Sequence, residues 1–324
     1  RPAKLPIEGA DLPNVMTSDE LLESDSLPES IVIIGGGVIG IEMASLFSAL
    51  GSRVTVIEAA GRILPPFDVE LSRSLSASLK KKGVTFATDA LVKRIEKTDG
   101  GLACVYEEKG EEKRAEGKRV LVSVGRKPNT EDLFADGFSV KTERGYIVAD
   151  ENGETSVKGV YAAGDVVFGL PQLAHAASAS ATNAVHSMHG ETKPYDIGVI
   201  PSCVYTSPEI ACVGLSEKEA AEKGIAAVSG KFIMSANART LIATDERCFI
   251  KLVFESETRR LIGAQLMCER ATDMIGELAT ALASGLGDKE LLRAVKAHPT
   301  FSEGIAEAAE DAFGGALHAA PKRR

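Results

Sequence analysis

The chain has 324 residues, of which 44% are hydrophobic and 26% are charged, a composition typical of a globular protein with room for two or three domains. Its formal net charge of −9 argues against nucleic acid or an anionic membrane surface as the main partner, and no apolar run reaches the roughly 20 residues that span a bilayer. Five scattered cysteines argue against a secreted disulfide scaffold and favour the reducing cytoplasm.

Residues 1–26 are polar and interrupted by prolines, a pattern typical of a connector rather than of a folding unit. The sequence starts at Arg1 and not at a methionine. We therefore expect these residues to follow a preceding part of a longer protein.

Residues 27–128 alternate short runs of β-branched residues with a helical segment. The clearest strands are SIVIIGG (30–36), RVTVIEA (53–59) and KRVLVSVG (118–125), which lack polar alternation, as expected of parallel strands covered on both faces. Between the first two strands, apolar residues at helical spacing over 40–51 end at Gly51. This order predicts a right-handed crossover in a parallel, Rossmann-like sheet.

The first of these strands runs into a glycine loop, in which Gly35, Gly37 and Gly40 have the G-x-G-x-x-G spacing at a strand–helix junction. Gly35 would permit the tight turn, Gly37 would leave space for a pyrophosphate, and Gly40 would let the helix approach the strand. Free N–H groups at the helix N-terminus would face the phosphates. The residues expected around the dinucleotide are Gly35, Gly36, Gly37, Val38, Ile39, Gly40 and Ile41. The alternative is a glycine-rich turn without a ligand.

The second strand ends at Glu58, where a carboxylate can accept both hydroxyls of an adenosine ribose and would repel a 2′-phosphate. NADP sites need cations at this place, but Ala59 and Ala60 follow. Arg62 is the nearest cation, and we interpret it as a surface or domain-contact residue. The site should therefore favour NAD over NADP.

Residues 129–195 contain one further apolar run, GVYAAGD (159–165), and an alanine-rich helical stretch over 173–188. We expect the run to be a buried parallel strand that presents Asp165 at its carboxyl end, the edge at which α/β sheets bind ligands. The alternative role of Asp165 is that of a helix cap or turn residue.

Residues 196–324 change character, because segments typical of antiparallel strands are grouped ahead of a set of helices. The expected strands are 202–214, 231–236, 248–256 and 260–268, and the expected helices are 272–285, 289–296 and 302–313. Strands grouped with helices on one side predict an α+β domain.

Near the end of the chain, His298 opens the sequence HPTFSE. An imidazole there can exchange a proton near neutral pH. The alternative is that Thr300 and Glu303 only form a T-x-x-E capping box for the last helix, with His298 at an exposed turn. The other histidines show no spacing that indicates a metal site.

Four stretches, in order, resemble the pyridine nucleotide-disulfide oxidoreductases, which are flavoproteins with two dinucleotide-binding domains. They are VSVGRKPNT (122–130), TSVKGVYAAGD (155–165), QLAH (172–175) and HPTFSE (298–303). The resemblance implies that Asp165 holds a ribityl hydroxyl of FAD. It implies further flavin contacts at a helix N-terminus, formed by Gln172, Leu173, Ala174 and His175. It places Glu42 near the nicotinamide–flavin contact. It also implies that Val92 and Gly125 line the NAD cleft.

In that family a histidine carries a proton to and from a substrate dithiol and a glutamate fixes its ring, so the resemblance gives these roles to His298 and Glu303. Glu58 followed by RILPPFD (62–68) is similar to the lipoamide branch, whose members oxidise dihydrolipoamide with NAD⁺ through FAD and a redox disulfide. The resemblance implies a homodimer through residues 196–324. For the full-length protein it implies a lipoamide-bearing acyltransferase of a 2-oxoacid dehydrogenase complex as partner.

The same resemblance defines four expected regions. They are a connector from an FAD-binding half (1–26), an NAD-binding domain (27–128), a remnant of the FAD-binding domain (129–195) and an interface or dimerisation domain (196–324). The family's first FAD glycine loop and its C-x-x-x-x-C redox pair are not in this sequence. We therefore expect this chain alone neither to retain FAD tightly nor to turn over lipoamide. The alternatives are a non-catalytic NAD-binding or dimerisation module, another disulfide reductase, and a soluble transhydrogenase.

Overall fold

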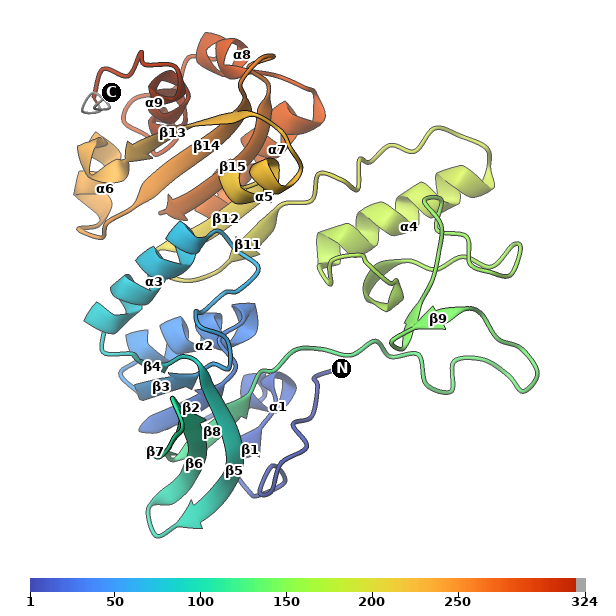
Figure 1. The fold of residues 1–324 in the computed structure, drawn as a ribbon, viewed down its shortest axis with the longest axis vertical. Coiled ribbons are helices and arrows are strands. Elements are labelled where there is room, and N and C mark those ends of the chain that lie inside the picture. Colours follow the sequence, from blue (N-terminus) through green and yellow to red (C-terminus); the bar gives the residue numbers. More distant parts are fainter. Residues whose placement is uncertain (319–324) are drawn as a thin grey trace. The chain divides into compact units, whose positions relative to one another are not determined.

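The computed structural model describes residues 1–318 and divides into two compact units (Figure 1). The larger unit contains residues 2–125 together with the chain from Pro201 onward. The smaller unit contains Arg1 and residues 126–200. Residues 319–324, the last six of the expected interface domain, lie outside the described residues.

The larger unit begins with a five-stranded parallel sheet, which confirms the predicted parallel arrangement. Its order is β1 (Val15–Met16), β8 (Arg119–Val122), β2 (Ser30–Ile34), β3 (Arg53–Ile57) and β4 (Thr85–Ala87). The helix predicted from residue 40 is α2 (Val38–Ala49), and α3 (Val69–Lys81) follows β3. Gly51, just beyond α2, has a φ of +94°, the left-handed conformation that favours glycine at a helix end.

Alternate residues of β2 supply two separate cores on the two faces of this sheet. Ile31 and Ile33 are buried against α2 and α3. Val32 and Ile34 are buried against a three-stranded antiparallel sheet of β5 (Ala90–Thr98), β6 (Gly101–Glu108) and β7 (Glu111–Gly117). Both faces of the parallel sheet are therefore covered, as the β-branched runs in its strands predict.

The segment expected as a connector contributes structure to this sheet. Val15 and Met16 pair with β8 as strand β1, and α1 (Ser18–Leu22) buries Leu21 in the core beside α2. A capping box between Thr17 and Glu20 starts α1. Part of residues 1–26 is therefore packed as an edge of the dinucleotide-binding fold.

The remainder of the larger unit is a five-stranded antiparallel sheet with helices, as the sequence predicts. Its order is β11 (Ser202–Val204), β12 (Glu209–Gly214), β15 (Leu261–Cys268), β14 (Phe249–Glu255) and β13 (Ala227–Ile233). Helix α7 (Ala271–Ala283) packs on β12 and β15, and α9 (Glu303–Ala312) packs on β13 and β14. Shorter elements are α5 (Glu217–Glu222), the 3-10 turn η2 (Met234–Ala236), α6 (Ala238–Ala243) and α8 (Asp288–Arg293).

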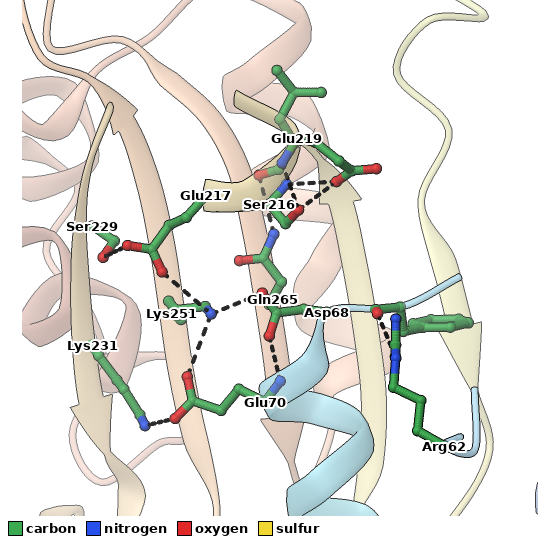
Figure 2. Close-up of polar contacts among 12 residues, drawn as sticks. Arg62, Asp68, Glu70, Ser216, Glu217, Glu219, Ser229, Lys231, Lys251 and Gln265 are labelled. Carbon is green, nitrogen blue, oxygen red and sulfur yellow. Dashed lines mark hydrogen bonds and ion pairs between the residues drawn. The ribbon is translucent and has the colours of Figure 1, made fainter. Parts of the chain in front are cut away.

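A row of polar side chains lies where α3 meets the five-stranded antiparallel sheet. The strand register places Lys231, Lys251 and Gln265 side by side on β13, β14 and β15. Figure 2 shows the Lys251 side chain pointing between carboxylates that come from two helices. Asp68, the N-cap of α3, accepts from the Glu70 N–H group and also bonds Lys251. The N-terminus of α3, the helix that covers one face of the parallel sheet, is thus bonded to the five-stranded antiparallel sheet.

The smaller unit has little regular structure. It contains the hairpin β9 (Thr142–Glu143) and β10 (Tyr146–Ile147), the 3-10 turn η1 (Gly164–Val166) and helix α4 (Ala174–Met188). The prediction of a buried parallel strand over 159–165 is wrong, because Tyr161 forms only an isolated antiparallel bridge with Glu154. A strand needs a neighbouring strand for its ladder, and the described part of this unit supplies none beside that run.

No helix within residues 1–318 combines the length and the hydrophobicity that crossing a membrane requires.

Candidate functional site

The glycine loop between β2 and α2 has a different local geometry at each glycine. Gly35 has a φ of +109°, and a Cβ atom there would lie 2.4 Å from the carbonyl oxygen of Ser123. A Cβ on Gly40 would lie 2.0 Å from the carbonyl oxygen of Gly35. A Cβ on Gly37 would meet nothing within 4 Å. Gly35 and Gly40 therefore allow backbone segments to approach each other closely, whereas Gly37 borders open space where a phosphate can approach.

The N-terminus of α2 borders the same open space. Gly37 is the N-cap, no side chain caps the helix, and its first turn holds no acidic residue. Val38 and Ile39 are half-buried, while Gly40 and Ile41 are buried against the sheet. The first N–H groups of α2 are thus available for an anionic ligand, and the helix dipole favours one.

Glu58 lies directly beside this loop at the end of β3. Its Oε2 atom accepts from the Gly36 N–H group at 2.5 Å, and its Oε1 atom accepts from the Ala60 N–H group at 2.6 Å. These two bonds fix the carboxylate, and each oxygen keeps a further lone pair for a ribose hydroxyl. The geometry therefore fits the dinucleotide site that the loop and the acid predict.

Arg62 has a local role that sequence reasoning did not specify. Its guanidinium group donates to the carbonyl oxygens of Leu64, Pro65 and Phe67 and to Ser72 Oγ. The arginine thereby fixes the loop that leads into α3. Because its guanidinium group is held by these hydrogen bonds, Arg62 is poorly placed to neutralise a 2′-phosphate.

Glu42 on α2 faces the antiparallel sheet region. Its Oε1 atom accepts from the Tyr205 N–H group at 2.8 Å. Burial raises the pKa of Glu42, and the bond from Tyr205 opposes that rise only in part. The expected cleft residues lie elsewhere in the same unit. Val92 belongs to β5, is 7% exposed and packs in the core between β5 and the parallel sheet. Gly125 has a φ of +115° with open space where a Cβ would be. Their contact with NAD stays a prediction.

The residues expected to contact flavin lie in the smaller unit. Asp165 is exposed in the turn η1, and the preceding Gly164 packs on α4 through a hydrogen bond from its N–H group to Ser180 Oγ at 3.1 Å. Helix α4 starts without a side-chain cap, and Ala174 and His175 are exposed in its first turn. Gln172 and Leu173 form the half-buried approach to this helix. An exposed carboxylate and an uncapped helix N-terminus are thus present in one unit, as a flavin would require.

His298 and Glu303 are in direct contact. The Nδ1 atom of His298 lies 2.8 Å from Oε1 of Glu303, and Oε2 of Glu303 accepts from the Thr300 N–H group at 2.8 Å. Partial burial raises the pKa of Glu303, but these bonds outweigh burial and hold the pKa below its usual value. The His298 side chain is 71% exposed. A carboxylate that accepts a hydrogen bond from Nδ1–H keeps the proton on Nδ1 and leaves Nε2 as the free base.

The T-x-x-E capping box is present only in half. Helix α9 begins at Glu303 with Ser302 as its N-cap. The Thr300 hydroxyl donates to the Ala297 carbonyl oxygen at 2.7 Å and does not accept a hydrogen bond from an N–H group of the helix. Glu303 therefore both binds the Thr300 N–H group and orients His298, so the two alternatives weighed from the sequence are combined in one side chain.

The five cysteines are free thiols, and none provides a ready thiolate. Burial raises the pKa of Cys104, Cys212 and Cys248 to about 12. Burial also raises the pKa of Cys203 and, more strongly, that of Cys268. Because thiol–disulfide exchange requires a thiolate, these residues are poor candidates for redox sulfurs.

Sequence reasoning missed one residue that contacts the loop of His298. Asn237, buried at the start of α6, donates from Nδ2 to the Thr300 carbonyl oxygen at 2.9 Å. An asparagine ahead of a short helical segment is a signal for an N-cap. That signal predicts the cap but not the contact with a loop 63 residues away.

Comparison with known families gives matches over nearly the whole chain. The family described as "Pyridine nucleotide-disulphide oxidoreductase" matches residues 1–181, and the dimerisation domain of that family matches residues 200–309. A dihydrolipoyl dehydrogenase of Staphylococcus aureus is 40% identical over 305 residues, which are 94% of this chain and 65% of that protein. One from Geobacillus stearothermophilus is 40% identical over 315 residues, 95% of this chain and 67% of the relative. The chain therefore spans about two thirds of the length of these relatives.

Solved structures give the same picture. The HOCl-induced flavoprotein disulfide reductase RclA from Escherichia coli superposes with a TM-score of 0.87 at 28% identity, over 96% of this chain and 71% of that one. LpdA from Mycobacterium tuberculosis superposes with a TM-score of 0.86 at 28% identity, over 95% of this chain and 67% of that one.

Proposed function

We propose that this chain, which belongs to the pyridine nucleotide-disulphide oxidoreductase family, forms the NAD-binding and dimerisation parts of a dihydrolipoyl dehydrogenase. The observation that carries the proposal is the 2.8 Å contact between His298 Nδ1 and Glu303 Oε1. This contact orients an imidazole base that can deprotonate a substrate thiol. The implied reaction converts dihydrolipoamide and NAD⁺ into lipoamide, NADH and a proton. The 40% identity to dihydrolipoyl dehydrogenases supports this substrate class.

NAD is the proposed pyridine nucleotide, held by the larger unit. The glycine loop and the α2 N-terminus would bind the pyrophosphate, and Glu58 would accept the ribose hydroxyls. NADP is disfavoured because its 2′-phosphate would meet the Glu58 carboxylate, while Arg62 is bound to the carbonyl oxygens of its own loop. When bound, NAD⁺ would be the final hydride acceptor.

His298 would act as the proton carrier for the substrate dithiol. Its Nε2 atom would remove a proton from one thiol so that the thiolate can attack the redox disulfide. Glu303 would accept a hydrogen bond from Nδ1–H and stabilise the imidazolium that forms, and the Thr300 N–H group would keep the Glu303 carboxylate in place. Each proton taken up by Nε2 can be returned to water or to a sulfur in the reverse step.

FAD is the second proposed cofactor, and only part of its site is expected in this chain. Asp165 and the residues 172–175 would contact it, and a bound flavin would relay electrons from sulfur to the nicotinamide. The sequence contains no C-x-x-x-x-C pair. We therefore propose that the chain by itself does not turn over dihydrolipoamide and does not retain FAD, since each missing charge-assisted hydrogen bond is worth roughly 1.5–3 kcal/mol.

The proposed assembly is a homodimer formed through residues 196–324, in which His298 serves a disulfide of the other subunit. Exposed apolar side chains on α6 and in the loop of His298 support this interface, because another subunit would cover them. Leu241, Ile242 and Val295 are 67%, 70% and 96% exposed. The further partner proposed for the full-length protein is the lipoamide-bearing acyltransferase of a 2-oxoacid dehydrogenase complex. Five free cysteines are compatible with the proposed cytoplasmic location.

An assay of the native protein from its source cells tests this proposal, with intact mass measured on the same sample. We expect a longer polypeptide with the cysteine pair, and NADH formation that depends on dihydrolipoamide and NAD⁺. A native protein that carries the cysteine pair but reduces no NAD⁺ with dihydrolipoamide would refute the substrate. A native protein with the mass of this chain that binds NADH without turnover would instead support a non-catalytic module.

A further inference from the structure

The loop that carries His298, residues 295–301, is held mainly by hydrogen bonds and ion pairs that involve side chains. Within residues 1–318, no N–H group of residues 295–301 donates to a backbone carbonyl oxygen. The His298 ring is largely exposed, so packing does not fix it. Its orientation therefore depends on Glu303, and the position of Glu303 relative to the ring depends on where the loop backbone lies.

In the part of the chain that the structure describes, two polar anchors reach this loop from other elements. Lys296 forms an ion pair with Glu277 on α7, at the start of the loop. Asn237 donates from Nδ2 to the Thr300 carbonyl oxygen at 2.9 Å, at its end. Only the second anchor touches a residue that itself bonds Glu303, because the Thr300 N–H group donates to Glu303 Oε2.

The other end of the Asn237 amide fixes its orientation. Its Oδ1 atom accepts from the Thr240 N–H group at 2.9 Å and from the Thr240 hydroxyl at 3.1 Å, which caps α6. A flipped amide would place its N–H groups against the helix N–H group and its oxygen against the Thr300 oxygen. Asn237 is 5% exposed, so water does not compensate for a lost contact. The nitrogen must therefore face Thr300.

We infer that Asn237 is a positioning residue for the His298–Glu303 pair. Its amide holds the Thr300 carbonyl group, the Thr300 N–H group orients Glu303, and Glu303 keeps the proton of His298 on Nδ1. A second contact from α6 supports the same loop, because the Arg239 guanidinium group lies 5.8 Å from the centre of the Phe301 ring. The functional meaning of this positioning rests on the proposed function, whereas the positioning itself does not.

The position requires a side chain that both caps a helix and donates a hydrogen bond outward. Asn237→Asp keeps the cap but replaces the outward donor with an oxygen that repels the Thr300 carbonyl group. Asn237→Ser also caps a helix, but its short side chain has no second group to reach Thr300. Thr240→Val is the matched control, because it removes one bond to Oδ1 and leaves the Asn237–Thr300 contact in place.

The tautomer of His298 is the quantity to measure, by nitrogen NMR of the 324-residue chain labelled at its five histidines. His298→Gln assigns the resonance, and spectra are taken at a pH where the ring is neutral. We expect the Nδ1–H form to dominate in the wild-type chain and in Thr240→Val. In Asn237→Asp and Asn237→Ser, the ratio of Nδ1–H to Nε2–H should fall about tenfold or more.

Persistence of the Nδ1–H form in both Asn237 variants would overturn the inference, as would an equal loss in Thr240→Val. If Asn237→Asp does not fold, the serine variant gives the result. The outcome separates from that of the proposed function. A lost tautomer in the Asn237 variants, together with full turnover of the native protein carrying His298→Gln, would sustain the positioning and refute the proton-carrier role.

Discussion

The Nζ atom of Lys251 lies 2.9 Å from Oδ2 of Asp68, and this ion pair joins the centre of the antiparallel sheet to the first turn of α3. The Lys251 side chain is 6% exposed and the Asp68 side chain 11%. Burial disfavours the charged lysine, but Asp68 and the nearby glutamates outweigh it and raise the pKa of Lys251. Since Asp68 also caps α3, the contact links the dimerisation fold to the element that follows the dinucleotide loop.

Lys251→Met should destabilise the larger unit strongly. The substitution leaves the Asp68 carboxylate buried without its cation, a change that typically costs about 3–5 kcal/mol. Lys231→Met is the matched control, because Lys231 pairs with Glu70 where both side chains are about one-third exposed, and such pairs contribute roughly 0–1 kcal/mol. Urea unfolding of both variants measures the difference. Equal losses would show that the burial of Lys251 does not matter.

Gly37→Ala and Gly40→Ala should separate ligand binding from folding. A Cβ on Gly37 meets nothing and its φ is −73°, so the variant should unfold like the wild type while the methyl group blocks the pyrophosphate. A Cβ on Gly40 would lie 2.0 Å from the Gly35 oxygen, so this variant should lose about 1–3 kcal/mol of stability. Calorimetric titration with NADH and urea unfolding give the two readouts. Wild-type NADH affinity in Gly37→Ala would contradict the assigned phosphate position.

Glu58→Ala should lower the affinity for NADH by about ten- to a hundredfold, because hydrogen bonds from the ribose hydroxyls to a charged group are worth roughly 1.5–3 kcal/mol. The affinity for NADPH should change less or rise, since the repelling carboxylate is gone. Calorimetry with each nucleotide gives the ratio. Glu222→Ala, which removes an exposed acidic side chain outside the proposed ligand contacts, serves as control. An unchanged preference for NADH in Glu58→Ala would place nucleotide selection elsewhere.

Asp288→Asn should change how stability depends on pH. Hydrogen bonds from Arg259 lower the pKa of Asp288 and outweigh the opposing effect of burial. A carboxyl group with a lowered folded pKa stabilises the fold above its unfolded pKa of about 3.9 and loses that contribution as the pH falls through the folded value. The variant should therefore be less stable at neutral pH, and its deficit should shrink in acid. Urea midpoints across this range test it, with the exposed Glu222→Gln as control.

The parts of the fold that could be predicted are those whose pattern is local. Runs such as 31–34 and 54–57 are rich in β-branched residues and carry no charge because both faces of the sheet are covered, and that pattern can be read without a partner. The sheet of β5 to β7 could not be predicted in this way, because its outer positions carry ion pairs such as Arg94 with Glu112. Charged alternation of that kind is also typical of exposed loops. Strand β1 has two residues and is a strand only through its pairing with β8.

The candidate site divides in the same way. The glycine loop and the His298–Glu303 contact involve residues close in sequence, so their spacing encodes the geometry. The contacts from Asn237 to Thr300 and from Lys251 to Asp68 join residues 63 and 183 positions apart. A single sequence carries no signal for such pairs, since an asparagine cap or a lysine on a strand has many other possible partners.

Ile242→Glu and Val295→Glu should weaken the proposed homodimer without weakening the subunit. Both side chains are largely exposed in a single chain, at 70% and 96%, so a charge there costs little in the monomer but would be buried in a dimer formed through this domain. Light scattering at tens of micromolar should give a dimer for the wild type and a monomer for each variant. Leu22→Glu is the matched control, because Leu22 is also 70% exposed but lies on α1, outside the dimerisation domain. A wild-type monomer, or dissociation by Leu22→Glu alone, would refute an interface through residues 196–324.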